Sequence, residues 1–150
     1  GFALVAILAV FNSGGRVIGG FLSDRIGRNK TLAIMFLLQA ANMLMFVNYT
    51  SMTSLTVGVC ITGIAYGSLL GIFPALTYDF FGLKNSGVNY GLVFTAFGAA
   101  GLIGPLTAGK IVDVTGSYSY AYLAAAAILV IAAIMVKFLS RPDQEAVITQ

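Results

Sequence analysis

Five stretches of nearly continuous apolar residues, separated by short polar segments, constrain this chain most strongly. A helix needs about 20 apolar residues to cross the hydrocarbon core of a bilayer. Only 9% of the residues are charged, whereas a soluble domain carries about a quarter. The predicted fold class is therefore an all-α, polytopic membrane helix bundle with about five transmembrane helices. The predicted spans are 2–22, 31–49, 55–78, 90–112 and 120–139, and a polar tail follows over 140–150.

The distribution of basic residues predicts how the bundle is oriented. Lys110 lies on one side of the predicted spans, and the other side holds Arg25, Arg28, Lys30, Lys84, Lys137 and Arg141. Loops rich in Lys and Arg stay in the cytoplasm. We therefore expect an integral protein of the plasma (inner) membrane, with the first loop, the third loop and the C-terminus in the cytoplasm.

The composition also argues against several classes of function. The chain has no histidine and a single cysteine, Cys60, so the commonest metal ligand and proton carrier are lacking. The net charge of +3 lies mostly in loops and forms no basic face for a nucleic acid. We predict no enzyme activity, no cofactor, no metal and no nucleic-acid partner.

Arg16 is a charged residue inside a predicted span, about 9 Å from its cytoplasmic end at roughly 1.5 Å per residue. Burying arginine at this depth costs at least about 2.5 kcal/mol. Asn12, Gly20 and Ser23 lie on the same helical face. A guanidinium can bind a carboxylate through paired hydrogen bonds, so Arg16 and Asn12 are predicted to bind an anion. The alternative is that Arg16 extends to the interface or pairs with a carboxylate of another helix.

Small residues recur at intervals of four on two spans. Such stripes allow membrane helices to approach closely, and plain packing is the expected role of nearly all of them. The third span carries Gly63, Gly67 and Gly71, and the fourth carries Ala96, Ala100, Gly104 and Ala108.

Three further polar residues have roles that the sequence leaves open. Tyr66 lies near mid-membrane, where a phenol needs a partner, so it is either a hydrogen-bonding group of a cavity or a structural tyrosine. Asp79 and Lys84 flank the third loop and are either solvated or paired with the first loop.

Two motifs resemble those of the major facilitator superfamily. The pattern Gly20-x-Leu22-x-Asp24-Arg25-x-Gly27-Arg28 resembles the G-x-L-x-D-R-x-G-R loop motif of that family. Gly104-Pro105-x-x-Ala108-Gly109 resembles its G-P-x-x-G-G motif, with Ala108 in place of a glycine. The resemblance implies helices eight to twelve of a twelve-helix transporter, in which two six-helix bundles alternate access to a central cavity.

This resemblance also implies roles for the motif residues. Gly20, Asp24, Arg25, Gly27 and Arg28 would form a gating loop, with Asp24 facing a helix N-terminus of the other bundle. Gly104, Pro105 and Gly109 would form a helix-packing motif. The chain has no initiator Met and opens inside an apolar run, so we expect part of a longer protein whose N-terminal bundle is a partner of this one.

A finer resemblance is to the oxalate/formate antiporters and the monocarboxylate transporters. Phe11-Asn12-Ser13-Gly14-Gly15-Arg16 looks like their eighth helix, where an arginine binds the substrate carboxylate. Oxalate carriers have a lysine in the eleventh helix, where this chain has Phe97. Because one buried cation suits one carboxylate, the predicted cargo is a monocarboxylate such as lactate, pyruvate or formate.

The predicted function is thus secondary transport of a small carboxylate across the lipid bilayer, coupled to protons or by anion exchange. Arg16, Asn12 and Tyr66 are the predicted substrate-binding residues. Three alternatives stay open, namely oxalate/formate exchange, transport of a sugar or drug, and a membrane protein that transports nothing.

Overall fold

The computed structural model describes residues 2–139, which form five α-helices and no strand. The helices are α1 (Phe2–Ile26), α2 (Arg28–Phe46), α3 (Met52–Phe81), α4 (Ser86–Thr115) and α5 (Ser119–Val136). The predicted all-α class is confirmed. The predicted tail at 140–150 lies outside the described residues.

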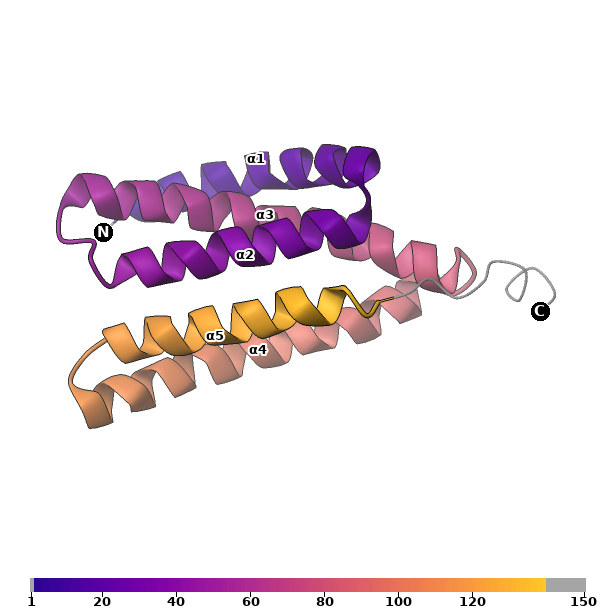
Figure 1. Ribbon diagram of the computed structural model, residues 1–150. Helices are drawn as coiled ribbons and strands as arrows, with labels where there is room; N and C mark the ends of the chain where they lie inside the picture. The colour runs from indigo at the N-terminus through magenta and orange to yellow at the C-terminus, as the bar shows by residue number, and fades with distance from the viewer. Residues whose placement is uncertain (1, 140–150) are drawn as a thin grey trace.

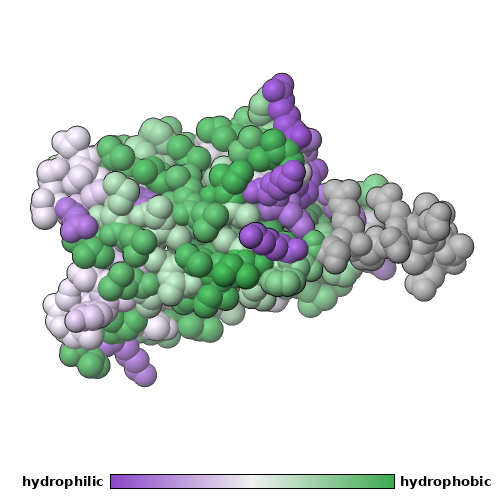
Figure 2. All heavy atoms as spheres, in the orientation of Figure 1, coloured by the Kyte–Doolittle hydropathy of each residue, from purple (hydrophilic) through white to green (hydrophobic). Residues whose placement is uncertain are grey.

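The helices run alternately up and down as one bundle (Figure 1). α1 packs along α3, α2 packs on α3 and α5, and α4 contacts α3 and α5. A small apolar core joins α2, α3 and α5 around Leu32, Ile72, Leu76 and Val136. Figure 2 shows a broad hydrophobic belt between two more hydrophilic ends, as expected of a bundle whose middle faces lipid.

Four helices, α1, α3, α4 and α5, are long and apolar enough to cross a membrane. α2 is not among them, because its apolar residues follow Arg28 and Lys30 and are interrupted by Gln39 and Asn42. It nevertheless lies between the other helices and runs along them (Figure 1). A helix covered by neighbours on several sides can bury polar groups that a lipid-facing helix cannot.

The basic segment at 23–30, predicted as a loop between the first two spans, is helical except at Gly27. α1 continues through Asp24 to Ile26, and α2 starts at once with Arg28. Charged residues mark where the chain leaves the hydrocarbon, but a helix can continue into the interface because its backbone bonds stay satisfied in water. The prediction of a loop across the whole segment was therefore wrong.

The two small-residue stripes lie in different surroundings. A Cβ added to Gly63 would lie 2.8 Å from Phe11 Cβ, and one added to Gly71 would lie 2.8 Å from the carbonyl oxygen of Arg16. The predicted close packing of the α3 stripe is confirmed, with α1 as its partner. Among the described residues, nothing lies within 4 Å of a Cβ added to Gly104 of α4, and none of the α4 residues is buried.

Candidate functional site

Arg16 projects from the middle of α1, beside the line of contact with α3. Gly15 and Gly19 are buried against Ile64 and Ser68 of α3, and Ser68 Oγ donates a hydrogen bond to the Gly15 carbonyl at 3.0 Å. Arg16 is exposed and Asn12 is partly buried. The close approach of the two helices thus fixes the backbone from which the Arg16 side chain extends.

The side chains of Arg16 and Asn12 come together as predicted from their spacing of one helical turn. Arg16 Nε donates to Asn12 Oδ1 at 3.4 Å, a long hydrogen bond. Within the described part of the chain, no carboxylate oxygen lies within 4.0 Å of the Arg16 guanidinium, since both ion pairs there involve Arg28. The remaining donors of Arg16 are therefore free to bind an anion.

Tyr66 lies at the depth of Asn12, because the next residue, Gly67, packs on the Asn12 backbone. The Tyr66 ring contacts Phe97 of α4, with 5.6 Å between centroids. Phe97 stacks on Phe94 at 5.1 Å, and Phe94 contacts Tyr90 at 5.6 Å. Tyr66 is 42% exposed, and its hydroxyl forms no hydrogen bond with any described residue.

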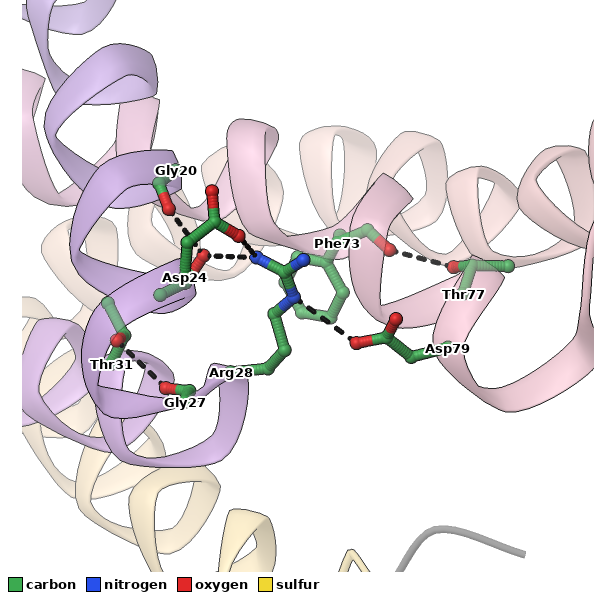
Figure 3. Close-up of polar contacts among 9 residues, drawn as sticks. Gly20, Asp24, Gly27, Arg28, Thr31, Phe73, Thr77 and Asp79 are labelled. Carbon is green, nitrogen blue, oxygen red and sulfur yellow. Dashed lines mark hydrogen bonds and ion pairs between the residues drawn. The ribbon is translucent and has the colours of Figure 1, made fainter. Parts of the chain in front are cut away.

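A second polar cluster lies at the end of the bundle where α1 meets α2, and Arg28 is its centre (Figure 3). Arg28 Nη1 donates to Asp24 and, at 2.6 Å, to Ser23 Oγ. Its Nε donates to Asp79 Oδ2 of α3 at 3.2 Å. Of the two readings of Asp79, pairing with the basic segment is confirmed.

Arg28 lies ahead of the predicted span at 31–49, at the membrane surface. Burial lowers the pKa of Arg28, but hydrogen bonds and charges from Asp24 and Asp79 raise it by more, so that the net shift is upward. Arg28 consequently stays charged, and the cluster keeps its cation throughout the physiological pH range.

Gly27 explains why the chain turns between α1 and α2. Its φ of 97° and ψ of 151° are open to glycine and strained for a residue with a Cβ. Its carbonyl accepts a hydrogen bond from Thr31 Oγ1 at 2.9 Å. Gly27 thereby turns the chain while Arg28 reaches back to Asp24 (Figure 3).

The structure does not bring all predicted motif residues into this cluster. The Arg25 guanidinium instead lies over the Phe21 ring, 4.3 Å from its centroid. Gly20 takes part only through its carbonyl oxygen, which accepts from Ser23 Oγ; a Cβ added to Gly20 or to Gly109 would have no neighbour within 4 Å among the described residues. Pro105, Gly109 and Lys110 border an open hollow of about 490 Å³. The packing role of Gly104, Pro105 and Gly109 stays a prediction.

Sequence reasoning missed two residues of this end of the bundle. Ser23 is 2% exposed and bridges Arg28 to the Gly20 carbonyl, which its Oγ contacts at 2.8 Å. Asn29 Nδ2 donates to the carbonyl of Leu139, three residues beyond the end of α5, at 2.6 Å. Ser23 could have been predicted to belong to this cluster because it is a polar residue inside the motif from Gly20 to Arg28. The contact between Asn29 and Leu139 could not, because it depends on tertiary structure.

Apolar helices of spanning length, with a charged cluster at one end of the bundle, define a helical membrane protein. The chain belongs to the Major Facilitator Superfamily, whose family model matches residues 1–149. The resemblance to this superfamily is thereby confirmed, and the chain is an integral membrane protein.

The curated relatives of this chain are named as several different transporters. The uncharacterized MFS-type transporter YhjX of Escherichia coli is 31% identical over 96 residues, which are 63% of this chain and 24% of the relative. The oxalate:formate antiporter of Oxalobacter formigenes is 31% identical over 102 residues, 67% of this chain and 24% of the relative. Human monocarboxylate transporter 2 is 34% identical over 82 residues, 55% of this chain and 17% of the relative. The chain thus spans about a quarter or less of the length of these relatives.

Proposed function

We propose that the full-length protein is a secondary active transporter that moves a small monocarboxylate across the membrane by alternating access. Lactate, pyruvate and formate are the proposed substrates, and Arg16 is the group that binds the carboxylate. Asn12 orients the guanidinium, and the Tyr66 hydroxyl is a further donor. The protein would act with an N-terminal bundle outside this chain.

The observation that supports this proposal best is the state of Arg16. Its guanidinium is exposed in the middle of an apolar helix, and Asn12 is its hydrogen-bond partner among the described residues. An arginine at this depth is costly unless it meets an opposite charge or water. A substrate carboxylate supplies that charge and accepts two parallel hydrogen bonds.

The neighbourhood of Phe97 supports a monoanion. The position where oxalate carriers are expected to have a lysine is occupied by an aromatic ring that contacts Tyr66 and Phe94. Burying a second carboxylate beside one arginine would leave a charge without a partner, which costs several kcal/mol. Relatives named as an oxalate:formate antiporter and a monocarboxylate transporter are compatible with a carboxylate cargo.

We further propose that the Arg28 cluster belongs to a gate on the cytoplasmic side. Arg28 holds Asp24 in place while the Asp24 side chain stays 66% exposed, so that its carboxylate can meet a positive helix end of the other bundle. Gly20, with no described neighbour at its Cβ position, leaves that face free for close approach. Positive residues at this end favour a cytoplasmic location and a plasma or inner membrane.

Coupling to protons or to a counter-anion would complete the cycle. The acids among the described residues are Asp24, Asp79 and Asp113, and all lie in the terminal segments of their helices. A proton carrier would therefore belong to another part of the protein, or else the substrate would exchange for a second anion.

The decisive experiment is uptake of labelled lactate, pyruvate and formate into liposomes that contain the full-length protein. Uptake is measured with a pH gradient, with an internal counter-anion and with neither. We expect saturable uptake of at least one substrate, and we expect Arg16→Gln to abolish it. Arg16→Lys keeps the charge but loses the paired geometry, so its KM should rise about tenfold or more.

The matched control is Lys137→Gln, which removes an exposed cation at the end of α5 and should leave uptake unchanged. All variants must elute as the same folded species as the parent protein. Normal saturable uptake by Arg16→Gln would remove Arg16 from the binding site. An absence of carboxylate uptake by the parent protein under all three conditions would refute the proposed function.

A further inference from the structure

Ser68 of α3 is a buried polar residue that the proposed function does not use. It is 0% exposed, and its hydroxyl lies within hydrogen-bond distance of two carbonyl oxygens. One belongs to Ile64 of the same helix, at 2.7 Å, and the other to Gly15 of α1, at 3.0 Å. A hydroxyl has one proton to donate, and the carbonyl four residues earlier in its own helix is an acceptor that any helical serine can use. The contact with α1 is therefore the unusual one.

The Ser68 side chain fits a notch that two glycines leave in the surface of α1. A Cβ added to Gly19 would lie 2.5 Å from Ser68 Cβ and 2.8 Å from its Oγ. A Cβ added to Gly15, one turn earlier, would lie 2.4 Å from the Ile64 carbonyl oxygen. A larger residue at either position would force the helices apart. The two glycines thus let the Ser68 side chain reach the α1 backbone.

This contact lies close to the depth of Arg16. A Cβ added to Gly71 would lie 2.8 Å from the Arg16 carbonyl oxygen, and Ser68 precedes Gly71 by three residues, about 4.5 Å along the axis of α3. The carbonyl that Ser68 contacts belongs to the peptide group that joins Gly15 to Arg16. The hydrogen bond therefore holds the peptide group from which Arg16 extends.

A directional contact matters here because the neighbouring contacts are smooth. The nearest atoms to a Cβ added to Gly67 or Gly71 are backbone atoms of α1, whereas ridges of side chains normally fix how one helix sits on another. Side chains extend to about 5 to 6 Å from a helix axis. Rotating α1 by about 20° would therefore move the Arg16 guanidinium by about 2 Å, which is enough to break its hydrogen bonds to a ligand.

We propose that Ser68 is a positioning residue for substrate binding, an inference that rests on the proposed role of Arg16. Its hydroxyl holds the Gly15 carbonyl and thereby fixes the rotation of α1 about its axis. The guanidinium then faces the carboxylate in the geometry that paired hydrogen bonds require. Ser68 does not bind substrate itself, because its side chain is buried between the two helices.

The first test is uptake of labelled lactate, pyruvate and formate into liposomes that contain the full-length protein. For each substrate that the parent takes up, Ser68→Ala should raise KM about fivefold, in line with the loss of one hydrogen bond between membrane helices. The maximal rate per folded protein should change less than about twofold, because the lost contact weakens binding and not a later step.

The matched control is Thr77→Val on the same helix. Thr77 is also buried, at 4% exposed, and its Oγ1 donates to the carbonyl of Phe73 four residues earlier, at 2.8 Å. Its removal takes a buried hydroxyl from α3 without touching the Gly15 carbonyl, so KM should stay within about twofold of the parent value. An unchanged KM in Ser68→Ala, or an equal rise in both variants, would overturn the proposal.

The Arg16→Lys protein separates positioning from a general effect of Ser68 on the bundle. Lysine is a point charge on a flexible stem, so its binding depends less on the rotation of α1. In this background Ser68→Ala should change KM less than about twofold. A rise as large as that in the parent protein would show that Ser68 does not act through Arg16, and the proposal would fail.

A last measurement does not depend on transport. Nitroxide labels at Val17→Cys of α1 and Ile128→Cys of α5, in full-length protein that carries Cys60→Ser, report the distance between these helices by pulsed EPR. Both labelled positions are exposed, at 73% and 66%. Ser68→Ala should shift or broaden the distance distribution by about 2 Å, and Thr77→Val should leave it unchanged.

The outcomes of the EPR measurement separate this inference from the proposed function. An unchanged distribution in Ser68→Ala would overturn the positioning role, even if uptake by the parent protein is normal. A parent protein that takes up none of the three substrates would instead count against the proposed function, and the distance distribution would still decide whether Ser68 fixes the rotation of α1.

Discussion

α3 and α4 are both 30-residue helices with an internal proline and a stripe of small residues, yet the structure treats them differently. α3 touches α1, α2 and α4, and its glycines Gly63, Gly67 and Gly71 lie against the α1 backbone. α4 has no buried residue, and the Cβ position of Gly104 has no neighbour within 4 Å in the described part of the chain.

This difference shows that a small-residue stripe specifies how closely a helix can be approached, and not which helix approaches it. On α3 the stripe brings α1 close enough for a hydrogen bond between Ser68 and Gly15, which also sets the position of Arg16. On α4 the same pattern leaves Gly104 without a close neighbour among the described residues, and the helix reaches the candidate site through Phe97, which contacts Tyr66 and stacks on Phe94.

The largest effect is expected for Gly67→Val. A side chain at Gly67 would meet the backbone of Asn12, which cannot move aside as a flexible side chain can. Forcing the helices apart should destabilise the protein by about 3 kcal/mol, seen as a large drop in the unfolding temperature of the purified full-length protein. Gly104→Val is the matched control, and a similar drop in both variants would contradict the contrast between the stripes.

A smaller loss is expected when the polar contact between α2 and α3 is removed. Asn42 is 1% exposed, and its Nδ2 donates to the Gly58 carbonyl at 2.9 Å and to Thr62 Oγ1 at 3.0 Å. Hydrogen bonds between membrane helices are worth about 0.6 kcal/mol on average, so Asn42→Ala, which removes two of them, should cost about 1 kcal/mol.

The matched control for Asn42→Ala is Thr107→Ala on α4. Thr107 Oγ1 donates to the carbonyl of Ile103 in its own helix, so its loss should cost much less. Thermal unfolding of both variants checks this order, and an equal or larger loss for Thr107→Ala would indicate that α4 has a polar partner.

Fold class could be predicted because it follows from the length and apolarity of the segments along the chain. The ends of the helices could not, since α1 stays helical through Asp24 although the charges mark the membrane surface. The pairing of Arg28 with Asp79 joins residues 51 positions apart, and charge alone left solvation as an alternative. The sequence also could not tell that Gly67 has a close partner while a Cβ at Gly104 has none within 4 Å among residues 2–139, because the two stripes have the same spacing.

A modest effect is expected at the ion pair that fixes the end of α3. The side chains of Arg28 and Asp79 are 20% and 28% exposed, and such a partly screened pair should contribute about 1 kcal/mol. A double-mutant cycle with Arg28→Gln and Asp79→Asn should measure a coupling of this size in the free energy of unfolding. The same cycle with Arg25→Gln, whose guanidinium lies over Phe21, should give a coupling near zero, and equal couplings would refute a specific pair.

The smallest effect is expected for Gly104→Ala. A Cβ at this position meets nothing within 4 Å among the described residues, and alanine is better than glycine inside a helix by about 0.5 to 1 kcal/mol. The variant should therefore unfold at the same temperature as the parent protein or slightly above it. The same substitution at Gly71, where the added Cβ would lie 2.8 Å from the Arg16 carbonyl oxygen, should lower the unfolding temperature. If Gly104→Ala is destabilising to the same extent, then a segment outside the described residues packs on α4 as tightly as α1 packs on α3.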